Sequence, residues 1–247
     1  MAAIARPDVR TPPARFASRV PASSWLLVAA GFFLASALLQ LVASLERWVS
    51  FSGARTDSTI EDHRFDYYYP ADPWENLGTT AQVFGVGLLL LALGILALAR
   101  AAGRDGDRAT RVLASVTAVS FALTGAHALA SGLIGTPTAL QYLPVQLLLS
   151  AVGFVGLIVL GVRFVRKSWL ASVAFAMLLG STLPGSLPAN FTIAPEIITY
   201  QSHDTTPFTE TIVAISTAAA AVVLLVAVAV THLTCRAPDA ANATRAD

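Results

Sequence analysis

Long runs of apolar residues alternate with shorter polar segments along most of the chain. An α-helix needs roughly 20 such residues to cross about 30 Å of hydrocarbon, and six runs approach or reach that length. The predicted spans cover residues 25–45, 81–99, 112–134, 142–162, 169–187 and 212–233. The sequence therefore predicts an all-α, polytopic membrane protein with six transmembrane helices.

The segments between and beyond these runs define the predicted organisation. Three connections on one side are the loops 46–80, 135–141 and 188–211. The tails 1–22 and 234–247 have no apolar period, and we expect them to be mobile. The fifth run begins at Trp169 but loses its apolar character near Pro184, so its end is the least sharply defined.

Composition and charge support the membrane class and give it an orientation. Hydrophobic residues make up 55% of the chain and charged residues 13%, whereas charged residues in soluble domains run near a quarter. Thirteen of the sixteen cations fall in the tails and in the connections after the second and fourth spans, and ten of the fifteen carboxylates fall on the other side. The positive-inside rule therefore predicts that both termini are cytoplasmic. Fifteen arginines against one lysine, with many alanines, suggest a GC-rich bacterial genome and a multi-pass protein of the bacterial plasma (cell) membrane.

Small residues recur every four positions in the third span. One row consists of Ala114, Ala118, Ala122, Ala126 and Ala130, and an adjoining row of Ser120, Thr124, Ala128 and Gly132. Such rows let helix backbones approach closely in a membrane. We expect the third helix to be the packed centre of the bundle, with a similar ridge on the fifth helix at Ser172, Ala176 and Gly180 as its partner.

Polar groups at membrane depth are few and unevenly placed. No Asp or Glu lies well inside a span, which argues against a proton pump but leaves open a carrier of neutral or lipid-like solutes. At 1.5 Å per residue, Gln40, Gln82, His127 and Gln146 all fall in the outer half of the bilayer. We predict that they line a shallow pocket beneath the outer loops; the alternative is that each bonds a neighbouring helix or snorkels to the headgroups.

Two polar islands at 61–74 and 199–210 are predicted to meet on the outer face as an aromatic and acidic cap. Arg64 could pair there with Asp204 or Glu210. Imidazole and carboxylate groups suit both acid–base chemistry and divalent metals such as Zn, Mn or Fe. The candidate catalytic residues are His63, Asp66, His203 and Asp204, and the candidate metal ligands are Asp62, His63, His203 and Asp204.

The leading hypothesis is a membrane protein without intrinsic catalysis whose outer cap contacts a partner protein, a lipid or a small solute. The alternative is an outer-face membrane enzyme that uses these His and Asp residues with a divalent metal as cofactor. The cytoplasmic connections contain no Gly-rich phosphate loop, and no segment has the size of a helix-turn-helix, so we expect no nucleic-acid partner. The lipid bilayer is the one partner that the composition requires.

Overall fold

A computed structural model describes residues 22–50, 74, 76–102, 108–202 and 205–243, with side chains as far as Leu233. This part of the chain is helical and contains no strand, which confirms the predicted all-α class. Five helices are long and apolar enough to cross a membrane, and a sixth span results if one sharply bent pair of helices counts as a single crossing.

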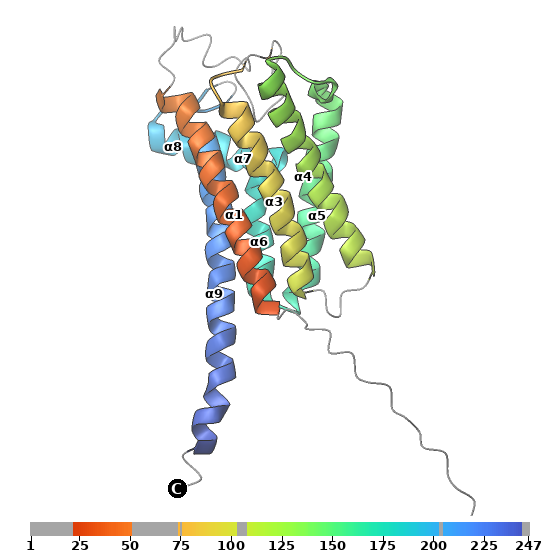
Figure 1. The fold of residues 1–247 in the computed structure, drawn as a ribbon. Helices are drawn as coiled ribbons and strands as arrows, with labels where there is room; N and C mark the ends of the chain where they lie inside the picture. Colours follow the sequence, from red (N-terminus) through yellow and green to blue (C-terminus); the bar gives the residue numbers. More distant parts are fainter. Residues whose placement is uncertain (1–21, 51–73, 75, 103–107, 203–204, 244–247) are drawn as a thin grey trace, which may run out of the picture.

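Most of the helical elements follow one another with connections of at most ten residues, whereas residues 51–79 separate η1 from α3. The elements are α1 (Ala22–Leu45), η1 (Glu46–Ser50), α3 (Thr80–Ala102), α4 (Arg108–Ile134), η3 (Ala139–Gln141), α5 (Leu143–Val165), α6 (Trp169–Leu178), η4 (Leu179–Ser181), α7 (Leu183–Pro188), η5 (Ala189–Ile193), α8 (Ala194–Ile198) and α9 (Thr209–Ala243). Part of each predicted outer loop is thus helical, since η1 extends α1 and η5 and α8 occupy 189–198. The last helix also extends into the predicted C-terminal tail, as Figure 1 shows.

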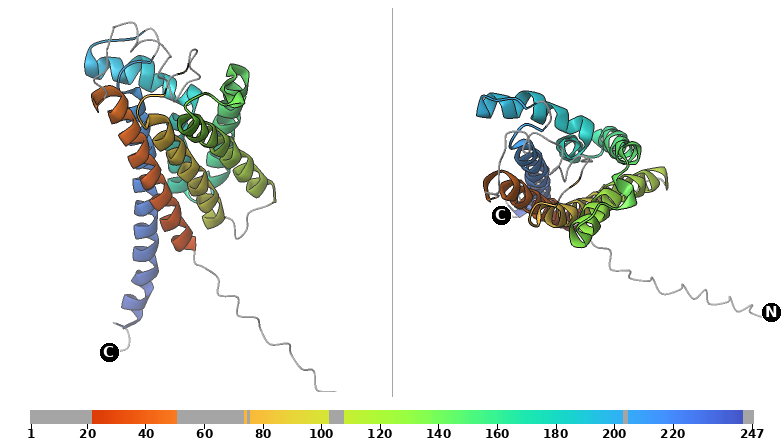
Figure 2. Two further views of the ribbon diagram at one scale, coloured as in Figure 1. Left: turned by 45° about the horizontal axis from the view of Figure 1, so that its top comes forward. Right: turned by 90° about the horizontal axis from the view of Figure 1, so that it is seen from above.

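The long helices form a closed ring in which each packs mainly against two neighbours. Around the ring the order is α1, α3, α4, α5, α6 and α9, and α9 closes it by packing on α1. Seen from above, α1, α3 and α4 form one row (Figure 2). Side chains from both halves of the ring fill its interior, among them Phe33, Leu91, Leu157, Phe175 and Leu224, which are all fully buried.

The prediction that the third helix is the centre of the bundle is wrong. This helix, α4, packs on α3 and α5, while α6 packs on α5 and α9, so the expected pairing of the third and fifth spans is wrong as well. Ala114 and Ala118 are buried but Ala126 is exposed. Residues four apart on a helix with 3.6 residues per turn are offset by about 40° around the helix axis. A row of five such alanines therefore turns around the helix and cannot face a single neighbouring helix along its whole length.

Glycines of α3 and α4 let the backbones of these two helices approach closely. A Cβ atom on Gly85 would lie 2.6 Å from the carbonyl oxygen of Gly125, and one on Gly125 would lie 2.7 Å from the oxygen of Gly85. Contacts this short leave no room for a side chain, so glycine is required at both positions for the observed crossing.

The fifth predicted span, 169–187, is broken rather than continuous. The segments Trp169–Ser181 and Leu183–Ile198 meet at an angle of 80°. Thr182 is extended, and its side chain accepts a hydrogen bond from the backbone N–H of Gly185, so it caps α7, whose first turn contains Pro184. A cap followed by proline starts a new helix in a new direction.

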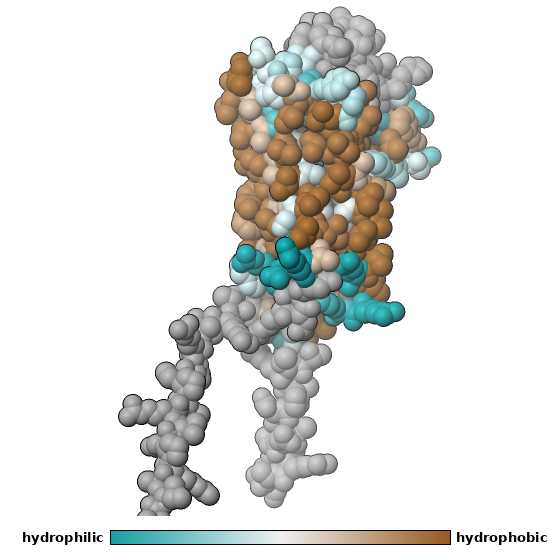
Figure 3. Space-filling model, turned by 90° about the vertical axis from the view of Figure 1, so that its right-hand side faces the viewer, coloured by the Kyte–Doolittle hydropathy of each residue, from teal (hydrophilic) through white to brown (hydrophobic). Residues whose placement is uncertain are grey.

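The two ends of the bundle differ in charge. We call the end where α1 and α4 begin the arginine-rich end, because the exposed cations Arg100, Arg108, Arg111, Arg163, Arg166 and Lys167 surround it. A hydrophilic band crosses the molecule there, below a broad apolar surface (Figure 3). We call the opposite end the acidic end, because the carboxylates among the described side chains, Glu46, Glu196 and Glu210, all lie there.

Polar contacts at the acidic end join α1 to its two neighbours in the ring. The carboxylate of Glu46 accepts hydrogen bonds from the backbone N–H and the hydroxyl of Thr79, at 2.7 and 2.8 Å, just before α3 begins. On the other side of α1, Ser44 bonds the Thr211 hydroxyl of α9 at 2.8 Å. These contacts hold the ends of three helices together where their apolar packing stops.

Candidate functional site

A small cavity lies between α3, α4, α5 and the break in the fifth span. Its volume is about 40 Å³. Since an ordered water needs about 10–15 Å³ on this measure, the cavity has room for about three waters or a very small solute. The lining residues are Phe84, Leu88, Ser120, Phe121, Thr124, Gln146, Leu149, Ser150, Gly153, Ser181, Thr182 and Leu183.

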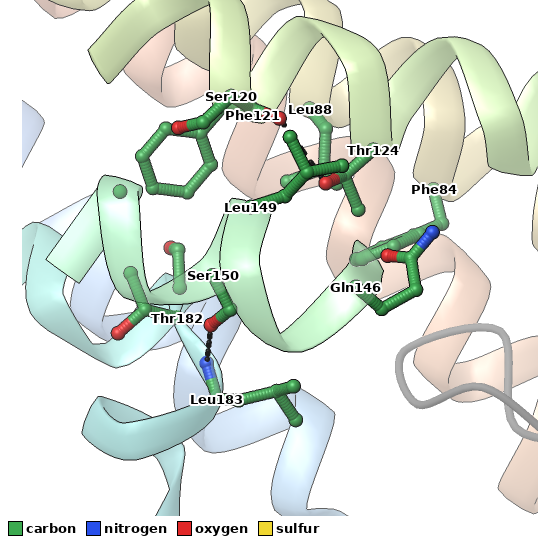
Figure 4. A pocket seen from close by; sticks show the side chains of 12 residues that line it. Phe84, Leu88, Ser120, Phe121, Thr124, Gln146, Leu149, Ser150, Thr182 and Leu183 are labelled. Carbon is green, nitrogen blue, oxygen red and sulfur yellow. Dashed lines mark hydrogen bonds between the residues drawn. The ribbon is translucent and has the colours of Figure 1, made fainter. Parts of the chain in front are cut away.

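The polar part of this lining consists of hydroxyl groups and one amide, without an acid or a base. The hydroxyls of Ser120 and Thr124 donate to backbone carbonyls of their own helix. The Ser150 hydroxyl oxygen accepts the backbone N–H of Leu183 at 2.8 Å and so joins α5 to the start of α7 (Figure 4). A hydroxyl can donate once and accept twice, so each of these three hydroxyls can form further hydrogen bonds.

An apolar layer separates the cavity from the arginine-rich end. Going from Leu88 towards that end of α3, the next inward-facing residues are Leu91 and Ile95, which are fully buried. Leu157 and Leu160 of α5 and Phe175 and Leu178 of α6 complete this layer and are also fully buried. The cavity therefore belongs to the half of the bundle at the acidic end.

The four residues predicted to line one pocket make separate polar contacts. Gln146 lines the cavity and donates to the carbonyl of Leu140 at 2.6 Å. Gln82 of α3 donates to the carbonyl of Gly132 in α4 at 2.7 Å, and the amide of Gln40 donates to the Ser36 hydroxyl of its own helix at 2.9 Å. The lining of this cavity includes Gln146 but not the other three.

His127 holds the connection between α4 and α5. Its Nδ1 lies 2.6 Å from the Thr138 hydroxyl, and its Nε2 lies 2.9 Å from the side-chain oxygen of Gln141. In a neutral ring Nε2 then donates to Gln141 and Nδ1 accepts from Thr138. Because Gln146 binds the carbonyl of Leu140 in the same turn, His127 and Gln146 act on one element, η3, from two helices.

The candidate catalytic and metal-binding residues Asp62, His63, Asp66, His203 and Asp204 lie outside the described residues. In the part of the chain that the structure does describe, no group of three or more His, Cys, Asp or Glu side chains could hold a metal ion. The hypothesis of a metal site between the two outer islands therefore stays a prediction.

Several residues around the cavity were not anticipated from the sequence. The sequence identifies Ser120 and Thr124 only as small packing residues, and it does not distinguish Ser150, Ser181 and Thr182 from other hydroxyl residues. The signal that could have found the last two is the stretch Gly180 to Gly185, where two glycines, two hydroxyl residues and Pro184 interrupt an apolar run. Ser150 gives no such signal, because its partner is 33 positions away.

No protein-family model, curated protein or solved structure matches this chain.

Proposed function

We propose that this chain is a non-catalytic membrane protein that binds a small uncharged polar solute in the cavity at the broken fifth span. The observation that carries the proposal is the lining: five hydroxyl groups and an amide converge on one cavity within an apolar bundle. Polar side chains placed at such depth need hydrogen-bond partners. Each of these groups already has one partner within the protein, and a neutral solute can use their remaining donor and acceptor capacity without bringing a charge into the membrane.

The break in the fifth span supports this proposal. A discontinuous helix leaves backbone groups without their intrahelical partners, and in membrane proteins such breaks occur where they line a cavity. Here Ser181, Thr182 and Leu183 at the break all face the cavity. The size of the cavity favours solutes with only a few non-hydrogen atoms.

Acetamide and acetate provide a sharp test because they have nearly the same shape but differ in charge. Saturation-transfer NMR on the protein in lipid nanodiscs should show acetamide binding and no comparable signal for acetate. Equal signals from both, or no acetamide signal, would contradict the proposal.

Two threonines of α4 provide a matched pair of variants. Thr124 and Thr117 both donate to the carbonyl four residues earlier, but only Thr124 lines the cavity. Thr124→Val should weaken acetamide binding about fivefold, as expected for one lost hydrogen bond, while Thr117→Val should leave it unchanged. An equal loss in both variants would show that the effect comes from the helix and not from the site.

A further inference from the structure

A second, larger cavity opens at the arginine-rich end of the ring. Its volume is about 340 Å³, within the range of sites that hold organic ligands. The floor is formed by Leu98, Phe164, Ala171 and Ala227, which are buried, and residues of α1, α3, α6 and α9 form its walls. The cavity is thus a mainly apolar funnel between five helices.

Charged and aromatic side chains lie in the lining of this funnel or next to it in sequence. Lys167 and Trp169 line it and are exposed, and Trp169 is 65% exposed. Arg100 lies over the ring of Trp25 at 5.6 Å from its centroid. Tryptophan is enriched at the headgroup level of membranes, and cations near it attract anionic headgroups. No carboxylate among the described side chains lies at this end to neutralise the cations.

We propose that this funnel binds one anionic phospholipid, with an acyl chain on the apolar floor and the phosphate near Lys167. The apolar walls suit a hydrocarbon chain, and the position at the end of the bundle places the charged group at the headgroup level. Charge disfavours residues 1–21 as an occupant, because that segment carries four arginines and one aspartate. The same charge argument favours an anionic over a zwitterionic lipid.

Native mass spectrometry of the purified protein with added phosphatidylglycerol or phosphatidylcholine of equal chain length tests the proposal. We expect one phosphatidylglycerol molecule to be retained and phosphatidylcholine to bind about tenfold more weakly. Equal retention of both lipids would show that the negative charge of the headgroup is not recognised, and this would overturn the proposal of an anionic lipid. Displacement of phosphatidylglycerol by inorganic phosphate at equal concentration would overturn the role of the acyl chain.

Charge-reversal variants separate a specific site from a general attraction. Lys167→Glu should lower phosphatidylglycerol retention about tenfold. Arg111→Glu makes the same change at an exposed position of α4 that does not line the funnel, and it should have little effect. Equal losses in the two variants would overturn the site.

The apolar floor can be tested separately. Ala227→Phe should reduce retention without changing any charge, provided that the variant elutes as a single species in gel filtration. If this variant misfolds, the comparison of Lys167→Glu with Arg111→Glu still decides the question, because both of those residues are exposed. Unchanged retention in a well-folded Ala227→Phe variant would show that the lipid does not enter the funnel.

Discussion

The guanidinium nitrogen Nη1 of Arg47 lies 2.5 Å from the carboxylate oxygen Oε1 of Glu210, and the two residues are 5% and 3% exposed. The second oxygen of this carboxylate accepts the indole N–H of Trp48 at 2.7 Å. The pair joins η1, which extends α1, to the start of α9, and its two residues are 163 positions apart in sequence. It is therefore a buried, charge-assisted link that closes the ring of helices.

Removal of one partner of this pair should be costly. Arg47→Met removes the cation that bonds the buried Glu210 carboxylate, and the loss of one partner of a buried ion pair costs about 3–5 kcal/mol of unfolding free energy. The double variant Arg47→Met, Glu210→Met should lose less stability than the sum of the two single variants, because the interaction between the two side chains is then lost only once. Thermal unfolding in detergent of all four proteins measures this coupling, and strictly additive losses would show that the two side chains do not depend on each other.

The glycine contact between α3 and α4 leads to a second prediction. Gly125→Ala should lower stability by about 1–3 kcal/mol, because the added methyl group would meet the carbonyl oxygen of Gly85. Gly31 on α1 is the matched control, since a Cβ atom there meets nothing within 4 Å. Gly31→Ala should be neutral or stabilising, as alanine is the better helix former. Thermal unfolding measures both variants. An equal change in stability for Gly125→Ala and Gly31→Ala would show that α3 and α4 do not cross closely at Gly125.

The hydrogen bond between Ser150 and Leu183 predicts a local rather than a global effect. Ser150→Ala removes the acceptor of the Leu183 N–H, so the amides at the start of α7 should exchange roughly tenfold faster. Ser172→Ala is a suitable control, because the Ser172 hydroxyl donates to the carbonyl of Gly161 and no backbone N–H loses its acceptor. Hydrogen exchange followed by mass spectrometry resolves the two segments, and unchanged exchange at 183–186 would contradict this role for Ser150.

The class of the fold was predictable from the sequence because it depends on the length of each apolar run. Every backbone group must be satisfied inside the hydrocarbon layer, so runs of that length form helices whatever their neighbours are. The order of helices around the ring was not predictable in this way. Ala114 and Ala126 look alike in the sequence, and only the neighbours of α4 decide that the first is buried and the second exposed.

The residues that line the cavity were harder to predict from the sequence than the class of the fold. Serine and threonine in membrane helices bond their own backbone, as Thr117 and Thr124 both do, so their identity alone does not show which of them lines a cavity. The ion pair of Arg47 and Glu210 illustrates the same problem, because the sequence suggests Arg64 as a partner for Glu210 and gives no sign of Arg47. Which cation reaches it depends on the contact between α1 and α9.

The last prediction concerns the side of the membrane on which residue 200 lies. If α6 to α8 formed a re-entrant hairpin, residues 166 and 200 would be on the same side. The structure favours a crossing, because the side-chain oxygen of Asn190 accepts the backbone N–H of Thr206 at 2.6 Å and the hydroxyl of Thr209 at 3.0 Å. These contacts hold η5 against the start of α9, which the ion pair of Glu210 and Arg47 fixes at the acidic end.

Reporter fusions at residues 105, 138, 166, 200 and 240 test this arrangement. Fusions at 105, 166 and 240 should report the cytoplasm and those at 138 and 200 the opposite side, because the arginine-rich end is expected to stay inside. The fusion at 105 serves as a control for 166, since it lies in the connection between α3 and α4 at the same end of the bundle. A cytoplasmic signal at both 166 and 200 would reduce the fifth span to a re-entrant segment and leave five crossings. In that case α9 would have to start on the cytoplasmic side. The ion pair between Arg47 and Glu210 excludes this, because it holds the start of α9 beside the end of α1, at the opposite end of the bundle from the start of α1.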